Sequence, residues 1–415
     1  MATHPEVGRL FVDGAAWADM DAWHAQASEL RRRSPVLRVE AEGFAPFYAL
    51  TRYADVLAVS RDSEGWLNTP WSVLGPEESR QRALRTGVLV PRSLVQLDGS
   101  EHKGHRKVTS DWFKPRAVAS RQARIDEIAD RFVDRMGELG GHCDFAREVA
   151  QPFTLRVIME IYGVPESDEA LMLELTQGIF GAGDPEFLGE AATAEDRVFD
   201  SLTRFVAYFN EMTEDRRRSP RDDLATVIAH GRVGDGPMGE AERLWYYIII
   251  ATAGHDTTSY ALSGGMEALL AHPEQLELVR RDLSLLDNAT EEILRWTSPV
   301  RHFLRYAGRP AELGGVRLAQ GDRVLLSYPA ANRDPEAFER PQRFDVARAG
   351  ADRHLAFGMG AHFCLGSRFA RREVRTFLGR LLPRLAAIEP AGTPEWAQSH
   401  FVSGVKHLPV HYRMA

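Results

Sequence analysis

The chain is poor in cysteine, with Cys143 and Cys364 as its two examples among 415 residues. Two cysteines cannot build a disulfide framework, nor supply the four thiolates that an iron–sulfur cluster usually takes. Basic residues are not in excess either, since 51 Lys and Arg stand against 59 Asp and Glu for a net charge of -8. We therefore expect a cytoplasmic protein that has no general electrostatic reason to bind nucleic acid.

Long apolar runs and linkers are also missing. The strongest apolar run, "WYYIIIATAG" from 245, is too short to cross a bilayer, and the N-terminal segment lacks the pattern of a signal peptide. No repeat and no Pro/Gly/Ser-rich linker divides the chain. With 44% hydrophobic residues, the sequence predicts one domain over residues 1–415, with no membrane association and no fused reductase or ferredoxin module.

Helical periodicity dominates what is present. "SRQARIDEIADRFVDRMGELG" from 120 and "RFARREVRTFLGRLLPRL" from 368 place apolar residues at intervals of three and four. Strand signals are short: "PVLRVE", "FYALTR", and "GVRLAQGDRVLLSY" from 315, the last read as a hairpin turning at Gln320 and Gly321. The predicted fold class is mainly α with a small β region (α+β).

The longest predicted helix runs from Glu240 to His272 and is ended by Pro273. It contains "ATAGHDTTS", where Gly254 costs about 1 kcal/mol against alanine. The hydroxyl of Thr257 can bond to a carbonyl one turn back. Local helix propensity is overruled here, and such places are often functional.

Cys364 lies in the glycine-rich stretch "HLAFGMGAHFCLG". Glycines let backbone N–H groups approach closely, and "LGSRFARREV" reads as a helix start, so the surroundings favour a thiolate. A nucleophile, a metal ligand and a plain buried cysteine remain open, because His362 is too local to settle a catalytic base and "HKGH" at 102–105 is too little for zinc. A single thiolate suffices when a porphyrin supplies the other four ligands, which makes haem the economical interpretation.

Residues 357–366, "FGMGAHFCLG", resemble the pattern Phe-Gly-x-Gly-x-His/Arg-x-Cys-x-Gly of the cytochrome P-450 superfamily of haem-thiolate monooxygenases, with every fixed position matched. "AGHDTT", Ala253–Thr258, is similar to that family's oxygen-binding segment. The resemblance implies a long central helix over a buried haem b, with Cys364 as the axial ligand. It also implies insertion of one oxygen atom from O2 into a C–H bond. "RWTSPV", "DRVLLSYPAANRD" and "FVSGVKHLPV" are similar to segments of the α-terpineol monooxygenase subfamily.

An acid and an alcohol stand together in the "AGHDTT" segment. On a helix Ile249, Ala253, Asp256, Thr257 and Tyr260 share one face, so an apolar wall leads to this pair. The resemblance implies that Asp256 and Thr257 relay protons during dioxygen activation. The alternative is a threonine-rich helix kink with a surface aspartate.

Buried haem propionates would need cationic partners, and arginine suits a carboxylate through paired donors. "LDGSEHKGHRK" resembles the family pattern Asp-x-x-x-His-x-x-x-Arg, although it lacks the usual proline of "DPPEH". The residues that the resemblance implies as propionate ligands are His102, Arg106, Arg305 and His362. We interpret His105 and His354 as structural histidines.

"EEILRW" places Glu292 and Arg295 three residues apart on a helix. By itself this spacing indicates an ordinary surface salt bridge. The resemblance implies a buried structural triad completed by Arg343 of "PQRF" at 341–344.

The predicted substrate pocket is apolar, which favours a monoterpenoid or alkyl-aromatic substrate over a sugar or peptide. A larger lipid, steroid or natural-product intermediate is the alternative. Trp66, Trp71 and Trp112 fall in or near the stretch where the family places its pocket lid, although core packing is the plainer interpretation of each. The predicted wall consists of Ile249, Ile250, Ala253, Val300, Phe303, Phe401 and Val402.

One local basic cluster carries a partner prediction. The resemblance implies that an acidic ferredoxin, supplied with electrons by an NAD(P)H-dependent reductase, docks there; a solvated helix face is the alternative. Other functions left open are a non-oxygenating haem-thiolate ligand binder and a haem-free cysteine hydrolase, although the intact Asp256–Thr257 pair argues against the first. The cluster consists of Lys103, Arg106, Lys107, Lys114 and Arg116.

Overall fold

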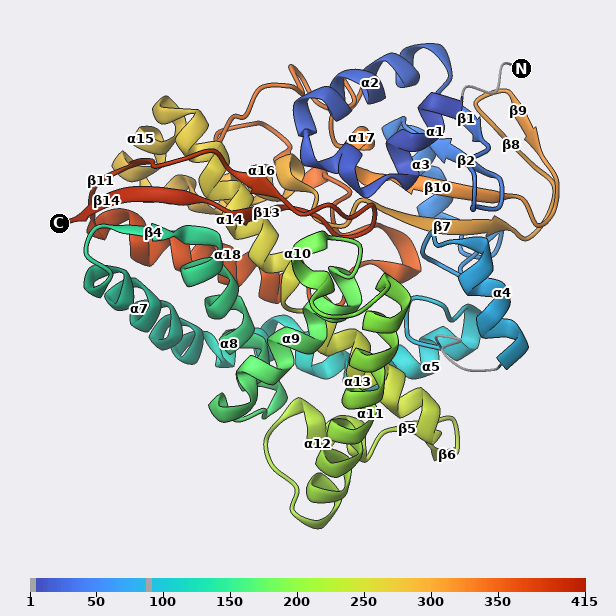
Figure 1. The fold of residues 1–415 in the computed structure, drawn as a ribbon, viewed down its shortest axis with the longest axis horizontal. Helices are drawn as coiled ribbons and strands as arrows, with labels where there is room; N and C mark the ends of the chain where they lie inside the picture. The colour runs from blue at the N-terminus through green and yellow to red at the C-terminus, as the bar shows by residue number, and fades with distance from the viewer. Residues whose placement is uncertain (1–4, 87–91) are drawn as a thin grey trace.

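The computed structural model describes residues 5–86 and 92–415, and helices form most of it (Figure 1). Helix α14 (Asp256–Ala271) runs through the middle of the molecule and packs against α8 (Gln151–Tyr162) and α16 (Leu286–Thr297). Helix α18 (Ser367–Leu381) packs on α7 (Gln122–Glu138), and both match the helical periodicity of the sequence. The predicted α+β class is therefore confirmed.

The remaining α-helices surround this centre. Within the two described ranges, none of the helices is long and apolar enough to cross a bilayer. Their bounds are α1 Pro5–Val12, α2 Met20–Arg33, α3 Tyr53–Arg61, α4 Glu77–Thr86, α5 Gly99–Ser110, α6 Pro115–Ser120, α9 Glu169–Phe180, α10 Pro185–Leu188, α11 Ala194–Arg218, α12 Leu224–Ala229, α13 Glu240–Ala253, α15 Pro273–Arg281 and α17 Tyr328–Ala331.

A five-stranded sheet with the order β1-β2-β10-β7-β3 lies at the N-terminal side of the molecule (Figure 1). Strands β1 and β2 pair antiparallel, as "PVLRVE" and "FYALTR" predict, and β2 also pairs parallel with β10. A second sheet has the order β11-β14-β4. The bounds are β1 Val36–Val39, β2 Phe47–Leu50, β3 Trp66–Leu67, β4 His142–Asp144, β7 His302–Ala307, β10 Arg323–Ser327, β11 Leu385–Pro390 and β14 Pro409–Met414; the short pairs are β5 Arg232–Val233 with β6 Gly236–Pro237, β8 Ala311–Leu313 with β9 Val316–Leu318, and β12 Glu395–Trp396 with β13 Val405–His407.

The predicted hairpin around Gln320 and Gly321 is wrong. A turn does occur there, but β9 pairs with β8, whereas β10 pairs with β7 and β2. Gly314 and Gly315 both have positive φ, of 52° and 79°, which suits the tight turn of a two-residue hairpin. Every residue of β10 is buried, so this strand takes partners on both sides within the larger sheet.

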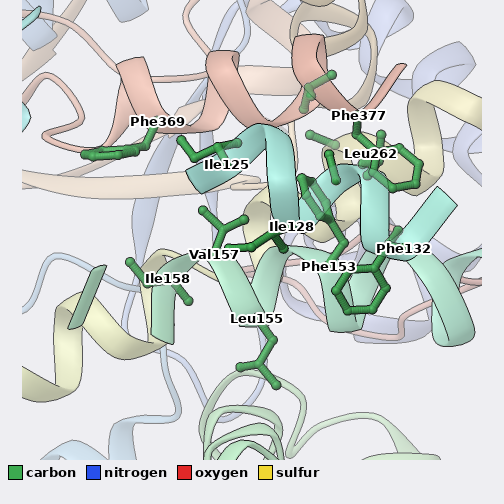
Figure 2. Packing of buried hydrophobic residues seen from close by; sticks show 14 of the residues in the cluster. Ile125, Ile128, Phe132, Phe153, Leu155, Val157, Ile158, Leu262, Phe369 and Phe377 are labelled. Carbon is green, nitrogen blue, oxygen red and sulfur yellow. The ribbon is translucent and has the colours of Figure 1, made fainter. Parts of the chain in front are cut away.

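The hydrophobic core joins α8 to α7 and α18 (Figure 2). Every side chain of α8 from Phe153 to Met159 is buried, and the Phe153 ring lies 4.7 Å from that of Phe377 on α18. Ile125 and Ile128 of α7 join the same cluster. Because α18 begins three residues after Cys364, this packing also fixes the cysteine loop.

The predicted helix from Glu240 to His272 is divided into α13 and α14, with a break at Gly254 and His255. A Cβ at Gly254 would lie 2.7 Å from Cγ1 of Ile158, so α8 can approach only because this residue is glycine. Thr257 Oγ1 donates to the Ala253 carbonyl at 2.9 Å, the bond one turn back that the sequence predicts. The break places Thr257 beside the cavity described below.

Candidate active site

A cavity of about 1100 Å³ lies between the α13–α14 region and the Cys364 loop. Its lining includes Cys364, Thr257 and the aromatic side chain of Phe357. The structure places all seven predicted wall residues at this cavity: Ile249, Ile250, Ala253, Val300, Phe303, Phe401 and Val402. Their role in holding a substrate stays a prediction.

The Cys364 loop is held by its backbone. Cys364 N–H donates to the Phe357 carbonyl at 2.9 Å. Gly358 and Gly360 have φ of 65° and 76°, and a Cβ at Gly360 would lie 2.2 Å from the carbonyl oxygen of Ser60. The sequence therefore needs glycine at 360, where the loop meets the end of α3.

The electrostatics of Cys364 differ from the expectation of a favoured thiolate. Cys364 is half-buried and lines the cavity. Burial raises the pKa of the thiol, and it outweighs the N–H of Gly366 and the Arg106 guanidinium, which lower it. The predicted helix start is present, and Arg106 and Arg371 lie near the thiol, but together they do not outweigh its burial.

Four cationic or potentially cationic groups face the same cavity: His102, Arg106, Arg305 and His362. The two histidine rings stack with centroids 4.0 Å apart, and burial is the main cause that lowers the pKa of His102 to about 4 and of His362 to about 3. Arg106 donates to the Phe363 carbonyl at 2.6 Å and Arg305 to the Leu304 carbonyl at 2.7 Å.

Of these four groups, His102 and the two arginines are poorly supplied with acceptors, whereas His362 Nε2 lies 4.0 Å from Asp98. Nε2 of His102 is buried with no hydrogen-bond partner among the described residues. In those ranges neither Arg106 nor Arg305 makes an ion pair with a carboxylate. Buried cationic donors without acceptors are costly unless a ligand supplies the missing acceptors. The arrangement fits an anionic ligand such as a pair of carboxylates.

Sequence analysis missed Asn68. Its Nδ2 lies 2.8 Å from His362 Nε2 and also 2.8 Å from Asp98 Oδ1. Burial would raise the pKa of Asp98, but hydrogen bonds from Asn68 and Thr69 outweigh it and lower that pKa. Asp98 could have been found, because it opens the Asp-x-x-x-His-x-x-x-Arg pattern; Asn68 carries no such signal. Together they fix the orientation of the His362 ring.

Only one member of the predicted pair of Asp256 and Thr257 reaches the cavity. Thr257 lines the cavity, but Asp256 does not, and Asp256 is buried. Asp256 Oδ1 lies 3.0 Å from Nδ1 of His255, the preceding residue. The prediction that Asp256 shares one helical face with Ile249 and Thr257 is therefore wrong, because the helix is interrupted at Gly254 and His255.

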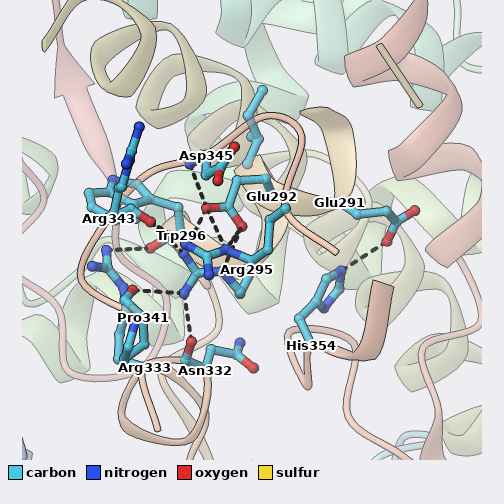
Figure 3. Close-up of polar contacts among 12 residues, drawn as sticks. Glu291, Glu292, Arg295, Trp296, Asn332, Arg333, Pro341, Arg343, Asp345 and His354 are labelled. Atoms are coloured by element: carbon cyan, nitrogen blue, oxygen red, sulfur yellow. Dashed lines mark hydrogen bonds and ion pairs between the residues drawn. The ribbon is translucent and has the colours of Figure 1, made fainter. Parts of the chain in front are cut away.

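The buried ionic cluster corrects a second prediction (Figure 3). Glu292 and Arg295 are fully buried and joined by two hydrogen bonds of 2.6 and 2.8 Å. The second guanidinium on Glu292 belongs to Arg348, whose Nε lies 3.1 and 3.0 Å from the two carboxylate oxygens. Arg343 is exposed and contributes its carbonyl, so it is not the third ion of the cluster.

The two histidines interpreted as structural have ordinary partners. His105 is buried, with Nδ1 2.9 Å from the Glu101 carbonyl and Nε2 3.3 Å from Glu242. His354 Nε2 lies 3.1 Å from Glu291 Oε2 (Figure 3). Neither lines the cavity.

The three tryptophans separate. Trp71 lines the cavity, Trp66 forms part of β3, and Trp112 stacks with the Arg121 guanidinium at 3.8 Å. Of the three tryptophans, Trp71 is therefore the one that lies where a pocket lid would contact the substrate.

The basic cluster loses Arg106, whose side chain turns inward to the cavity. Lys114 pairs with Asp111 at 2.6 Å. The exposed members of the cluster are Lys103, Lys107, Lys114 and Arg116.

No group of three or more His, Cys, Asp or Glu in residues 5–86 and 92–415 is arranged to hold a metal ion. Among the described residues, Cys364 therefore lacks the further ligands that a zinc site would need. A thiol in a large apolar cavity that is ringed by unpaired cationic groups is the arrangement expected of a haem-thiolate enzyme.

Comparisons with known proteins agree with this class. A family profile described as Cytochrome P450 matches residues 85–407. The chain is 35% identical to Cytochrome P450-terp of Pseudomonas sp, covering 100% of this chain and 99% of that protein. It is 30% identical to the Steroid C26-monooxygenase of Rhodococcus jostii, with 97% and 86% covered. The crystal structure of CYP108D1 from Novosphingobium aromaticivorans superposes with a TM-score of 0.91 at 39% identity, covering 100% and 99%.

The chain belongs to the cytochrome P450 family, and it is a monooxygenase of that family. The long central helix region, the cysteine loop and the cavity between them correspond to the fold that the sequence motifs predict. Family membership also implies the haem-thiolate cofactor.

Proposed function

We propose that the protein inserts one oxygen atom from O2 into a C–H bond of a small hydrophobic substrate. One observation carries the proposal: Cys364, the apolar wall and the unpaired cationic groups line the same cavity of about 1100 Å³. A haem-free cysteine hydrolase would not need the cationic groups.

The residues present fit haem b. Cys364 would be the axial ligand, and His102, Arg106, Arg305 and His362 would hold the propionates, because the free Nε2 of His102 and the unpaired guanidiniums lack acidic partners. When bound, the haem supplies the redox chemistry that activates dioxygen.

The chain's own residues would control water and protons around that chemistry. Ile249, Ile250 and Phe401 exclude water from the apolar end of the cavity. Thr257 Oγ1, fixed by its bond to the Ala253 carbonyl, is the hydroxyl that faces the cavity next to Asp256. We infer that Asp256 supplies protons through Thr257.

A monoterpenoid or alkyl-aromatic substrate is the class that we propose first. The wall is apolar and selects by shape, and the relative named Cytochrome P450-terp supports a terpenoid. The cavity is large, and the relationship to a Steroid C26-monooxygenase supports a steroid or larger lipid as the second candidate.

Electrons would come from a separate ferredoxin and its NAD(P)H-dependent reductase. The exposed Lys103, Lys107 and Arg116 support docking of an acidic protein. Charge reversal by Lys107→Glu is expected to slow reduction by ferredoxin and to reduce its salt dependence. A cytoplasmic location stays a prediction that cell fractionation would test.

The cofactor assignment is tested by Cys364→Ser. We expect the variant to lose the red-shifted Soret band of the reduced carbon monoxide complex that a thiolate ligand produces. An unchanged spectrum would show that another residue binds the iron.

The substrate class is tested by titrating the protein with monoterpenes, alkylbenzenes, fatty acids and steroids while the Soret band is followed. A low-spin to high-spin shift with the first two classes, followed by hydroxylated product, supports the proposal. A shift with steroids alone would favour the second candidate, and a shift without product would favour a non-oxygenating ligand binder.

A further inference from the structure

Most of the cavity wall is apolar, but the turn that precedes α5 brings a side-chain amide to it. Residues 93–96 form this turn, in which the Gln96 N–H donates to the Ser93 carbonyl at 3.0 Å. All four residues of the turn line the cavity, and Gln96 is buried. The functions above do not use the Gln96 side chain.

Hydrogen bonds fix both the backbone and the side chain of Gln96. Its backbone carbonyl accepts a bond from Thr69 Oγ1 at 2.6 Å. Its side-chain Oε1 accepts two bonds from Ser93, one from the backbone N–H at 3.1 Å and one from Oγ at 2.6 Å. A glutamine usually loses rotamer freedom when it binds a ligand, but here that loss has already occurred on folding.

The Ser93 N–H determines how the amide is oriented. A backbone N–H can only donate, so the atom that faces it is the Gln96 carbonyl oxygen and not the NH2 group. Nε2 makes no hydrogen bond in the described ranges, and, unlike Nε1 of Trp71, it is not sealed inside the packed protein. Because Gln96 is buried and lines the cavity, the two hydrogens on Nε2 are left for a molecule in the cavity.

Neighbouring polar groups of the wall are engaged differently. The hydroxyl of Thr252 donates to the Ile248 carbonyl at 2.8 Å. That of Thr257 donates to the Ala253 carbonyl at 2.9 Å. Both donors therefore already have acceptors within their own helix, whereas the donor of Gln96 has none among the described residues.

Haem is the competing partner for this donor. Thr69, which binds the Gln96 carbonyl, also donates its N–H to Asp98 at 2.9 Å, and Asp98 lies 4.0 Å from His362. The turn is thus connected to the groups that we propose to hold the propionates. Arginines suit a carboxylate better than a neutral amide does. A neutral donor in an apolar wall suits a neutral oxygen of the ligand.

We propose that Gln96 is a specificity-determining residue that donates a hydrogen bond to an oxygen atom of the substrate. The inference rests on the proposed function and narrows its substrate class to hydrocarbon frames that carry a ketone or hydroxyl oxygen. The apolar wall holds the frame, and one donor at a fixed place sets which C–H bond is presented for oxidation. A plain hydrocarbon leaves the donor unpaired, which disfavours its binding.

The test measures dissociation constants by Soret titration for menthone and p-menthane, which share a carbon skeleton and differ in the ketone oxygen. Gln96→Leu removes the donor. Thr252→Val is the matched control, because it removes a lining hydroxyl that is already bonded to the Ile248 carbonyl. We expect Gln96→Leu to weaken menthone binding about 3- to 10-fold and to change p-menthane binding less than about twofold. Thr252→Val should leave the ratio of the two constants unchanged.

The outcomes separate this inference from the proposed function. Equal weakening of both ligands in Gln96→Leu would overturn the inference, because the side chain would then act by shape alone. Faster transfer of haem to apomyoglobin with an unchanged ratio would overturn it in favour of a propionate contact. The expected ratio without hydroxylated product would support the donor and overturn the proposed oxygen insertion. Failure of the wild type to bind either ligand would overturn the inference, while hydroxylation of a fatty acid or steroid would still support oxygen insertion.

A measurement on the wild type covers the case in which Gln96→Leu does not fold. Infrared difference spectra of menthone with a carbon-13 carbonyl should show the C=O stretch at lower wavenumber when bound than in an alkane, since a hydrogen bond polarises the carbonyl. Gln96→Asn should reduce this shift, because its amide is one methylene shorter. A wild-type stretch at the alkane position, or a shift that Gln96→Asn does not change, would overturn the inference.

Discussion

Two groups of buried charges in this protein are arranged in opposite ways. Glu292 pairs with the guanidinium of Arg295 (Figure 3) and also with that of Arg348, so each of these three charges has a partner within the protein. Around the cavity, Arg106 and Arg305 meet only backbone carbonyls. Paired buried charges serve the scaffold, whereas unpaired ones that face a cavity mark where a ligand must complete the structure.

The largest effect is expected where the paired group is broken. Glu292→Ala leaves Arg295 and Arg348 without their shared carboxylate, and we expect the free energy of unfolding to fall by about 3–5 kcal/mol. Urea denaturation measures this. Glu339→Ala is the control, because the Glu339 side chain is 84% exposed and its ion pair with Arg340 is worth little. A loss for Glu292→Ala as small as that of the control would contradict the role of this cluster.

The same experiment checks the corrected membership of the cluster. Arg348→Ala removes two hydrogen bonds to Glu292 and should cost about 1–3 kcal/mol. Arg343→Ala keeps the backbone carbonyl and removes only an exposed side chain, so we expect a change within about 0.5 kcal/mol. A larger loss of stability in Arg343→Ala than in Arg348→Ala would instead support the triad of Glu292, Arg295 and Arg343 that the sequence predicts.

Acid should weaken the scaffold next to this cluster. Burial alone would raise the pKa of Glu291, but its contacts with His354 and Arg371 lower it to about 2. A carboxylate with a lowered pKa stabilises the fold above its ordinary value of 4.5, and that contribution is lost as the pH falls towards 2. The shift corresponds to about 3 kcal/mol at most. Unfolding free energies measured from pH 5 to pH 3 should fall less steeply in Glu291→Gln; an unchanged slope would contradict the assignment.

Substitution of an arginine that faces the cavity should lower the affinity for haem and leave the stability of the fold unchanged. Arg305→Ala removes a guanidinium proposed to bind a propionate, and the loss of about 1.5–3 kcal/mol corresponds to roughly 10- to 100-fold faster transfer of haem to apomyoglobin. Arg323→Ala is matched, since Arg323 is a buried arginine of the neighbouring strand β10 that does not line the cavity. It should leave the transfer rate unchanged. Equal rates of haem transfer in Arg305→Ala and Arg323→Ala would contradict the proposal that the cavity-facing arginines bind the haem.

The sequence predicted the unpaired group better than the paired one. Cys364, His102, Arg106 and His362 fall within short motifs, because a ligand loop and a helix start position them locally. Arg305 was found through its own short segment. A contact made along the chain over a few residues can be read from spacing.

Contacts between distant segments could not be read in this way. Nothing in the sequence shows that Arg348, rather than the nearer Arg343, folds back on Glu292, or that Asn68 reaches His362. The Asp256 prediction failed for another reason, since an ideal helical face was assumed across Gly254 and His255. Backbone breaks redirect side chains, and their geometry depends on the packed partner, here Ile158 of α8.

An exposed ion pair at the rim of the cavity extends the comparison to charges that solvent screens. Glu195 at the start of α11 contacts Ser79, and it lies 3.4 Å from Arg82 of α4, so it joins two helices whose residues line the cavity. We expect Glu195→Gln to increase the rate of the substrate-induced Soret change, but by a factor below about five, because exposed ion pairs contribute less than about 1 kcal/mol. High salt should reproduce the effect in the wild type and not add to it in the variant. Asp196→Asn is the control, because its carboxylate bonds to Thr193 and not to α4; an equal effect in Asp196→Asn would show that overall rim charge, and not this link between the helices, limits substrate entry.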